Sequence, residues 1–279
     1  MTGTADTTTE LLTEFRPPVA VATFNRPEAR NAMTWAMYDA LAEFCDRVDA
    51  AADVRVAVLR GAGGKAFVAG TDIAQFLEFD GAADGLAYER RIDSVLARVE
   101  QVRVATIAVV DGYATGGGLS LAAACDLRIC TPRARFGLPI ARTVGNCLSM
   151  AGYARLVQLV GASRAMHLVY TAGFVDGETA GHIGLASEVV AESELDTRVG
   201  QLCTQLAAQA PLTMLATKTA VRRLREHALP PGRTSSNCAT AARTFARVSP
   251  RSSRSARRAG GAGDEPCPAV PCEGQTGRR

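Results

Sequence analysis

Residues 104–125 read VATIAVVDGYATGGGLSLAAAC, and this stretch decides the fold. Val104–Val110 is an apolar run, which predicts a strand buried on both faces. Gly116, Gly117 and Gly118 follow, and the small apolar residues of Leu119–Cys125 predict a short helix. A strand, a glycine turn and a helix in this order indicate an α/β protein whose turn brings backbone close to a ligand.

The sequence on both sides repeats this alternation. Short apolar runs that end in turn residues predict strands, and longer segments with apolar residues at helical spacing predict helices. Crossover connections between such elements are typical of an α/β fold. Thr34 is expected to cap the first helix. The predicted strands are 19–24, 54–60, 104–110, 127–130, 134–137 and 186–190, and the predicted helices are 34–48, 86–102, 119–125, 149–160, 163–170, 176–182, 194–210 and 211–227.

The composition excludes several protein classes. The chain has 279 residues, of which 47% are hydrophobic and 21% charged, so it can bury a sizeable core and is neither wholly disordered nor a disulfide miniprotein. No window approaches the ~18 consecutive apolar residues of a membrane helix. The polar start, Met1–Glu10, has no hydrophobic run typical of a secretory signal. We therefore expect a cytoplasmic protein without a membrane segment.

The last 48 residues differ from the rest. Residues 232–279 contain nine Arg, no Lys and three acidic residues, so they carry +6, whereas residues 1–231 carry −3. The segment holds too few large apolar residues to fold alone, which predicts disorder. An Arg-rich nucleic-acid tail is the functional alternative. We favour an out-of-frame translation of a GC-rich gene as the cause of this composition and disorder as its consequence. The small net negative charge of residues 1–231 predicts no nucleic-acid partner.

Cysteine and histidine give no metal site. The eight cysteines, four of them in two pairs with four intervening residues, have no nearby His to complete a zinc set, so we interpret them as reduced and mostly buried thiols. The three histidines stand apart on helical stretches. They are His167, His182 and His227.

A second glycine turn precedes another helix start. Lys65–Ile73 reads KAFVAGTDI, which places Gly70 and Thr71 directly after a short apolar run. Free amides at such turns can bind phosphate or a carbonyl oxyanion, and a purely structural turn is the alternative. A P-loop is excluded because no Lys-Ser/Thr follows Gly118, and the G-x-G-x-x-G spacing is absent. Two turns that each direct one N–H at a single oxygen would form an oxyanion hole. We interpret Asp72 as a cap or turn ligand rather than a base.

Seven stretches, in order along the chain, resemble the crotonase superfamily, which comprises enoyl-CoA hydratases and isomerases. Together they cover roughly residues 15–228. They are NRPEARNA (25–32), KAFVAGTDI (65–73), DGYATGGG (111–118), ACDLRI (124–129), ARFGLP (134–139), RL (155–156) and GLA (184–186).

The resemblance implies a fold, a ligand and an assembly. It implies a flexible N-terminus (1–14), a crotonase-like spiral of ββα repeats (15–191) and a C-terminal helical region (192–231), assembled as a homotrimer or a dimer of trimers. The ligand would be a coenzyme A thioester, with no metal and no further cofactor. The oxyanion donors would be the N–H groups of Thr71 and Gly117, and Arg26, Arg30 or Lys65 would meet the CoA phosphates. The implied substrate-binding positions are Arg26, Ala29, Lys65, Ala66, Ala69, Thr71, Asp72, Ile73, Ala74, Gly116 and Gly117.

Two positions depart from the hydratases that the chain resembles. Those enzymes place one glutamate two residues after the triple glycine and another directly after Phe-Gly-x-Pro, where this chain has Ser120 and Ile140. Hydration needs a group that activates water and a group that protonates the α-carbon, and neither replacement suits these roles. Isomerases of the family keep the second glutamate, so Ile140 argues against that activity too.

Other groups would then carry out the proton transfers of the reaction. Cys147 is one candidate, beside Ser120 and an ordered water. For Arg142, Asn146 and Cys147 the alternative is packing or shaping of the acyl pocket. Tyr113 follows the family pattern and is interpreted as structural. The remaining candidates are Arg142, Asn146, Glu78 and Asp80.

Two hypotheses follow. The first is an acyl-CoA-processing enzyme of lyase or isomerase type, active in fatty acid metabolism, that stabilises a thioester enolate. The second is a non-catalytic acyl-CoA-binding or scaffold protein that kept the fold and lost the carboxylates.

Overall fold

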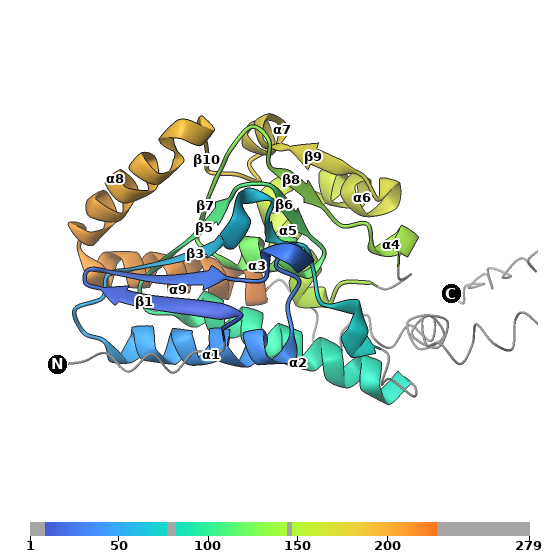
Figure 1. Ribbon diagram of the computed structural model, residues 1–279, viewed down its shortest axis with the longest axis horizontal. Coiled ribbons are helices and arrows are strands. Elements are labelled where there is room, and N and C mark those ends of the chain that lie inside the picture. The colour runs from blue at the N-terminus through green and yellow to red at the C-terminus, as the bar shows by residue number, and fades with distance from the viewer. Residues whose placement is uncertain (1–8, 77–81, 144–146, 228–279) are drawn as a thin grey trace, which may run out of the picture.

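Two β-sheets, shown in Figure 1, form the centre of the protein. The computed structural model describes residues 9–76, 82–143 and 147–227. The larger sheet has the strand order β1-β2-β3-β5-β7-β10, and the smaller has the order β4-β6-β8-β9. The strands are β1 Leu11–Arg16, β2 Val19–Phe24, β3 Val56–Gly61, β4 Ala66–Val68, β5 Ala105–Val110, β6 Tyr113–Thr115, β7 Leu127–Cys130, β8 Arg135–Gly137, β9 Phe174–Asp176 and β10 Glu188–Val189.

From β3 to β8, consecutive strands alternate between the two sheets and produce a spiral. The pairs β3/β4, β5/β6 and β7/β8 each place the first strand in the larger sheet and the second in the smaller one, and a helix follows each pair. This arrangement confirms the predicted spiral of ββα repeats. The helices are α1 Trp35–Ala50, α2 Ala82–Gln101, α3 Gly117–Ala124, α4 Ile140–Thr143, α5 Met150–Val160, α6 Ala162–Thr171, α7 Gly177–His182, α8 Leu195–Ala207 and α9 Pro211–His227.

The strand β5 lies in the middle of the larger sheet and is buried on both faces, as its apolar run predicts. Ile107 and Val109 face one side and pack with Leu195, Val199 and Leu202 of α8. Ala108 and Val110 face the main core on the other side. Alternate residues of one strand thus join two separate hydrophobic clusters.

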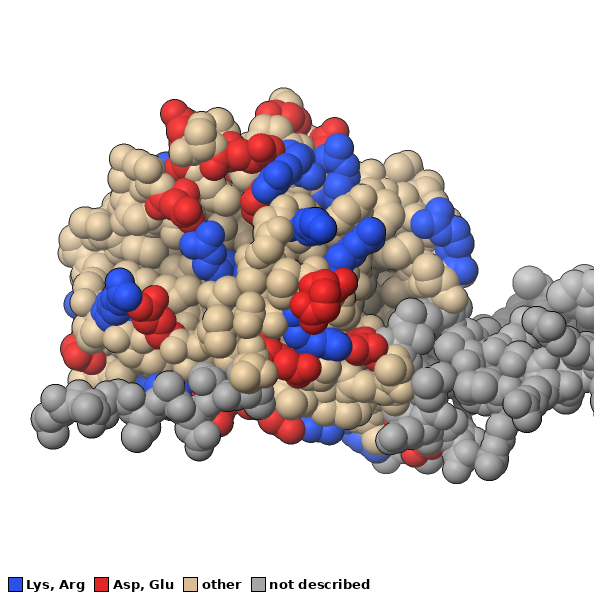
Figure 2. Space-filling model, viewed as in Figure 1, with Lys and Arg blue, Asp and Glu red and all other residues tan. Residues whose placement is uncertain are grey.

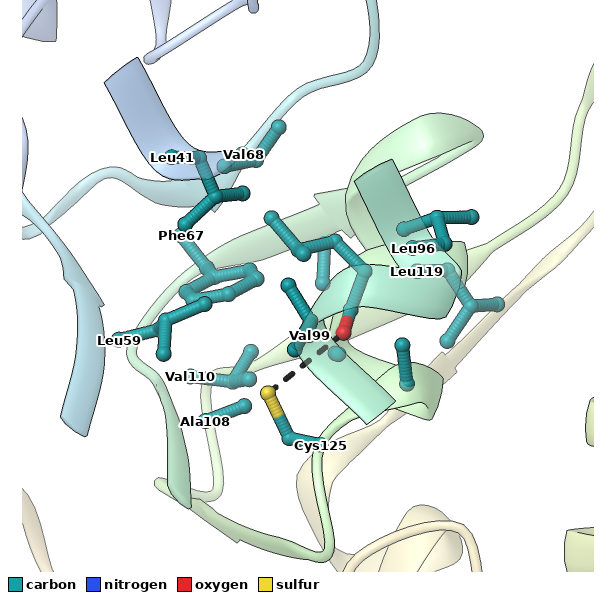
Figure 3. Close-up of a cluster of buried hydrophobic side chains, with 14 of the residues drawn as sticks. Leu41, Leu59, Phe67, Val68, Leu96, Val99, Ala108, Val110, Leu119 and Cys125 are labelled. Carbon is teal, nitrogen blue, oxygen red and sulfur yellow. Dashed lines mark hydrogen bonds between the residues drawn. The ribbon is translucent and has the colours of Figure 1, made fainter. Parts of the chain in front are cut away.

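The helix α3 is anchored in the main core. Figure 3 shows Leu119 of α3 and Cys125, which directly follows α3, in one cluster with Phe67 and Val68 of β4 and Val110 of β5. The Cys125 thiol donates a 3.6 Å hydrogen bond to the carbonyl of Leu121 in α3. This packing fixes the direction of α3, and hence the position of its first residue, Gly117.

Several local predictions can be compared with the structure. Thr34 caps α1, since its side chain accepts from the Met37 N–H at 3.2 Å. The five cysteines among the described residues are free thiols, four of them buried. The expected flexible N-terminus (1–14) is wrong in part, because Leu11–Arg16 pairs along its whole length with β2 and Leu11 is fully buried.

Charged side chains of both signs are mixed on the face shown in Figure 2, where neither sign forms a separate patch. Among the described residues, no helix combines the length and the apolar character needed to cross a membrane. The tail 232–279 lies outside the described residues.

Candidate active site

The two glycine turns lie side by side at one edge of the smaller sheet. β4 and β6 are parallel neighbours, with Ala66 opposite Tyr113 and Val68 opposite Ala114, so the turns that follow them meet at the same end. A Cβ built on Gly117 would lie 3.6 Å from Oγ1 of Thr71. The structure therefore brings together the two residues that the sequence singles out as oxyanion donors.

Glycine is required for this close approach. A Cβ on Gly118 would lie 1.9 Å from the Val68 carbonyl oxygen, so α3 can pack against the end of β4 only without a side chain there. Gly116 has a φ of +53° and Gly70 a φ of +103°, in the region that side chains disfavour. The triple glycine thus serves close packing and turn geometry as well as access to the backbone.

The amides of Thr71 and Gly117 are not used by the local backbone. Met33 and Thr71 form an isolated parallel β-bridge, in which the Met33 N–H donates to the Gly70 carbonyl and the Asp72 N–H donates to the Met33 carbonyl. The Thr71 N–H therefore points away from Met33. Gly117 is the first residue of α3, where amides have no partner within the helix. Within the described part of the chain, neither N–H donates to a backbone carbonyl. Both can therefore donate to a ligand, and the helix dipole of α3 favours negative charge at Gly117.

A chain of three hydroxyl groups borders these turns. Oγ1 of Thr71 lies 2.8 Å from the Tyr38 hydroxyl of α1 and 2.8 Å from the Tyr88 hydroxyl of α2. The Tyr38 oxygen would lie 3.3 Å from a Cβ on Gly117. Trp35 packs against both phenol rings, with centroid distances of 6.0 and 5.7 Å. Sequence reasoning missed both tyrosines, because each is one aromatic residue on a helix far from the glycine motifs.

Burial keeps both phenols protonated. Loss of solvation raises the pKa of Tyr88 to about 12, although the hydrogen bond from Thr71 opposes the shift. Burial also raises the pKa of Tyr38 far above its usual value, and the neighbouring Tyr88 adds to this shift. At neutral pH these groups can donate and accept hydrogen bonds but carry no charge.

Of the residues predicted to carry the chemistry, Ser120 contacts one of the two turns. Ser120 lies one turn into α3 and is half-buried, with its Oγ 3.3 Å from the Gly116 carbonyl oxygen. Ile140 is the half-buried first residue of α4, Arg142 is exposed, and Cys147 is half-buried. The other three candidates lie outside the described residues, namely Asn146, Glu78 and Asp80.

The basic residues assigned to the CoA moiety differ in their contacts. Arg26 is held in place by ion pairs to Glu10 (3.2 Å) and Asp72 (2.9 Å), whereas Arg30 and Lys65 are exposed. Asp72 is a turn ligand, as predicted, since its Oδ1 accepts from the Ala74 N–H at 3.0 Å.

The other residues assigned to the CoA moiety are small or apolar. Ala66 is buried in β4, and Ala29 and Ala69 are half-buried. Ile73 and Ala74 lie in the 3-10 turn Ile73–Phe76.

Asn31 joins the first motif to this region. It is fully buried, and its side chain accepts from the Arg26 N–H and donates to the carbonyls of Ala62 and Ala66. The NRPEARNA stretch is thereby fixed beside the start of β4. Tyr113, interpreted as structural, stacks edge-on against Phe174 with Arg30 over its ring.

No metal site is found in the part of the chain that the structure describes. No group of three or more His, Cys, Asp or Glu there is arranged to hold a metal ion. All three histidines are exposed. Among the described residues, the groups placed next to the two turns include the backbone amides of Thr71 and Gly117 and the neutral hydroxyls of Tyr38, Thr71 and Tyr88.

Comparisons with known proteins agree with this architecture. The family described as enoyl-CoA hydratase/isomerase matches residues 14–253, which extends past the predicted boundary at 231. A short-chain-enoyl-CoA hydratase of Clostridium acetobutylicum is 34% identical over 205 residues, covering 74% of this chain and 78% of that protein. An (E)-benzylidenesuccinyl-CoA hydratase of Thauera aromatica is 36% identical over 202 residues, covering 72% and 78%.

Solved structures show the same likeness. The crystal structure of an enoyl-CoA hydratase/carnithine racemase from Magnetospirillum magneticum superposes with a TM-score of 0.75 at 29% identity, covering 79% of this chain and 82% of that one. The family match spans most of the chain, and the spiral of ββα repeats agrees with it. The chain therefore belongs to the enoyl-CoA hydratase/isomerase family.

Proposed function

We propose that the protein is an acyl-CoA-processing enzyme that stabilises a thioester enolate with the N–H groups of Thr71 and Gly117. The observation that carries the proposal is the meeting of two turns from neighbouring parallel strands, each with an amide that the local backbone leaves unused. One such donor is worth about 3–4 kcal/mol of transition-state stabilisation in enzymes with oxyanion holes. The relatives named above are CoA-thioester hydratases, which supports a thioester as the ligand.

The proposal includes a departure from ordinary hydration. If Ser120 and Ile140 occupy the positions of the two glutamates, the site has no carboxylate to activate water there. The protic side chains that border the turns are instead the hydroxyls of Tyr38, Thr71 and Tyr88. Such a site suits reactions that need a stabilised enolate but not paired carboxylates, such as exchange of a proton at the α-carbon.

The decisive experiment removes one donor without removing a helix hydrogen bond. Gly117 is the first residue of α3, a position that accepts proline, so Gly117→Pro deletes the N–H with little cost to the helix. We expect α-proton exchange of butyryl-CoA in deuterated water, and any turnover of crotonyl-CoA or longer enoyl-CoAs, to fall at least about 100-fold. Gly117→Ala is the control, because it retains the N–H although its methyl group would lie 3.3 Å from the Tyr38 hydroxyl.

The outcomes separate the two hypotheses. Unchanged turnover in Gly117→Pro would contradict the assignment of this amide. Binding of CoA esters without proton exchange or turnover in the unmodified protein would favour the non-catalytic alternative. Calorimetry with crotonyl-CoA measures binding independently of turnover, so the two tests together decide between an enzyme and a binding protein.

We also propose that copies of the chain associate as trimers. Support comes from α9, on which Leu212 and Leu224 are 78% and 72% exposed. Large apolar side chains at this exposure commonly mark a contact surface. Light scattering of the full chain tests the proposal, and a monomeric mass at micromolar concentration contradicts it.

A further inference from the structure

A cavity of about 510 Å³ lies at the other end of α3 from the candidate active site. The C-terminal residues of α3, Ala123 and Ala124, line it, whereas Gly117 and Thr71 do not. Its other walls come from the end of α2, the starts of β5 and β7, the helices α5 and α8, and one face of α9. The volume falls within the range of about 300–1,000 Å³ that is typical of small-molecule sites.

Most of the wall is aliphatic. On α9, Met214 and Val221 face the cavity at helical spacing, and they lie opposite residues from the start of β5 and from α5. A hydrocarbon chain would be removed from water along this wall, at a gain of about 25 cal/mol per Å² of apolar surface buried. The aliphatic members from the other elements are Val104, Leu127, Leu159 and Leu206.

The charged side chains of the wall are predominantly basic. Six basic residues line the cavity, namely Arg103, Arg128, Arg155, Lys218, Arg222 and Arg225, against two acidic ones, Glu100 and Asp126. Arg103 and Arg128 donate to backbone carbonyls, and Lys218 pairs with Asp126 at 2.7 Å.

The remaining acid is shared between two cations. Glu100 Oε1 lies 2.9 Å from Nε of Arg155 and 2.7 Å from Nη1 of Arg225. Nη2 of Arg155 also donates to Oε2 of Glu100 at 2.9 Å, and the Arg155 side chain is only 3% exposed. The charge of Arg155 interacts with Asp93 as well, so two carboxylates and two guanidinium groups meet here.

Two guanidinium groups also retain unused donors. Nη1 of Arg155 and Nε of Arg222 are buried and have no hydrogen-bond partner among the described residues. A carboxylate oxygen of Glu226 lies 3.8 Å from Nε of Arg222, beyond hydrogen-bonding distance. Buried donors of charged groups are normally satisfied, so these two indicate a missing acceptor.

We propose that this cavity binds an apolar monocarboxylate, such as a medium-chain fatty acid anion. The carboxylate would accept hydrogen bonds from Arg155 and Arg222, and the hydrocarbon chain would lie against Met214, Val221 and the aliphatic wall. The two unused donors, one on Arg155 and one on Arg222, match the two oxygens of one carboxylate. The site is distinct from the proposed thioester site and does not depend on its chemistry.

Calorimetry of the full chain with decanoate tests the proposal, with decanol as the uncharged probe. We expect decanoate to bind and decanol to bind at least about tenfold more weakly, because charge-assisted hydrogen bonds carry the difference. Crotonyl-CoA should not displace decanoate. Absence of decanoate binding, equal binding of decanol, or displacement by crotonyl-CoA would each overturn the proposal.

Variants on α9 provide matched controls. Arg222→Met removes a donor from the cavity and should weaken decanoate binding about tenfold, whereas Arg223→Met, at the next position and exposed, should leave it unchanged. Thr217→Phe fills the cavity from the same helix face and should abolish binding. Equal weakening by Arg222→Met and Arg223→Met, or undiminished binding in Thr217→Phe, contradicts the assignment.

Discussion

The hydroxyl group of Tyr38 lies 2.8 Å from Oγ1 of Thr71, which ties the helix α1 to the turn that follows β4. The same phenol oxygen would lie 3.3 Å from a Cβ on Gly117, at the start of α3. Tyr38 is 3% exposed and therefore has little freedom to move. One buried side chain thus contacts both turns and fixes their relative position, on which the proposed pair of donors depends.

Tyr38→Phe should therefore lower turnover more than substrate affinity. The variant loses one buried hydrogen bond, with a cost of about 1 kcal/mol in the free energy of unfolding. A small displacement of the Thr71 amide weakens transition-state stabilisation, so kcat should fall about tenfold while KM changes little. Tyr113→Phe is the control, because Tyr113 is 37% exposed and lies outside this cluster. Equal kinetic effects of the two substitutions would contradict a positioning role for Tyr38.

The buried thiols predict a loss of stability at alkaline pH. Burial raises the pKa of Cys125 from 9.0 to about 12, and nearby Arg128 only partly offsets this shift. Between pH 9 and 12 the unfolded chain releases this proton while the folded chain keeps it, so the unfolded state binds fewer protons and stability falls as pH rises. Each such group contributes a slope of up to about 1.4 kcal/mol per pH unit.

Urea unfolding as a function of pH measures this slope. We expect Cys125→Ala to decline less steeply than the unmodified protein between pH 9 and 12, while the two curves stay parallel below pH 8. Burial also raises the pKa values of Cys45, Cys130 and Tyr88 to about 12. These groups are still present in Cys125→Ala, so its stability also falls with rising pH, but less steeply. Identical slopes for the two proteins would show that Cys125 ionises equally in the folded and unfolded states.

The triple glycine predicts unequal effects of adding one methyl group. Gly118→Ala places a Cβ 1.9 Å from the Val68 carbonyl oxygen, so the backbone must move, at a cost of about 3 kcal/mol or more. A Cβ on Gly116 meets nothing within 4 Å, and the cost comes from its backbone conformation (φ +53°, ψ −117°), about 1–3 kcal/mol. Chemical denaturation should therefore rank Gly118→Ala as the less stable variant, and the reverse order would contradict the close contact of α3 with β4.

Much of the fold could be predicted from the sequence because the signals are local. The apolar run of β5, the Thr34 cap and the glycine turns each act within a few residues, and the structure contains all three. The strand β1 was missed because Leu11–Arg16 contains no continuous apolar run, and only its pairing with β2 explains its order. A strand stabilised mainly by its neighbour gives a weak signal in its own sequence.

The site could be predicted only in part. The two turns are visible as glycine motifs, but the hydroxyl groups that border them come from Tyr38 and Tyr88 on two different helices. Neither tyrosine has a special neighbour in sequence, and only the packing of α1 and α2 brings them to Thr71. The cavity at the far end of α3 was not predicted for the same reason, since it combines residues from seven helices and strands between α2 and α9, spread over more than 100 positions.

The absence of carboxylates at positions 120 and 140 leads to a gain-of-function prediction. If the backbone donors are in place and only proton transfer is missing, Ser120→Glu with Ile140→Glu should increase hydration of crotonyl-CoA. Both positions are half-buried, so the new carboxylates are partly shielded from water, which raises their pKa toward the range useful for general acid–base catalysis. A gain of at least about 100-fold over the unmodified protein is expected, since one effective proton transfer contributes about 10²–10⁴. Loss of absorbance of the enoyl thioester measures the rate.

The control for this gain of function is Ser120→Gln with Ile140→Gln, which has the same size without acid–base chemistry and should show no gain. If the glutamate and glutamine variants are equally inactive while both still bind crotonyl-CoA, the geometry of these two positions does not support hydration.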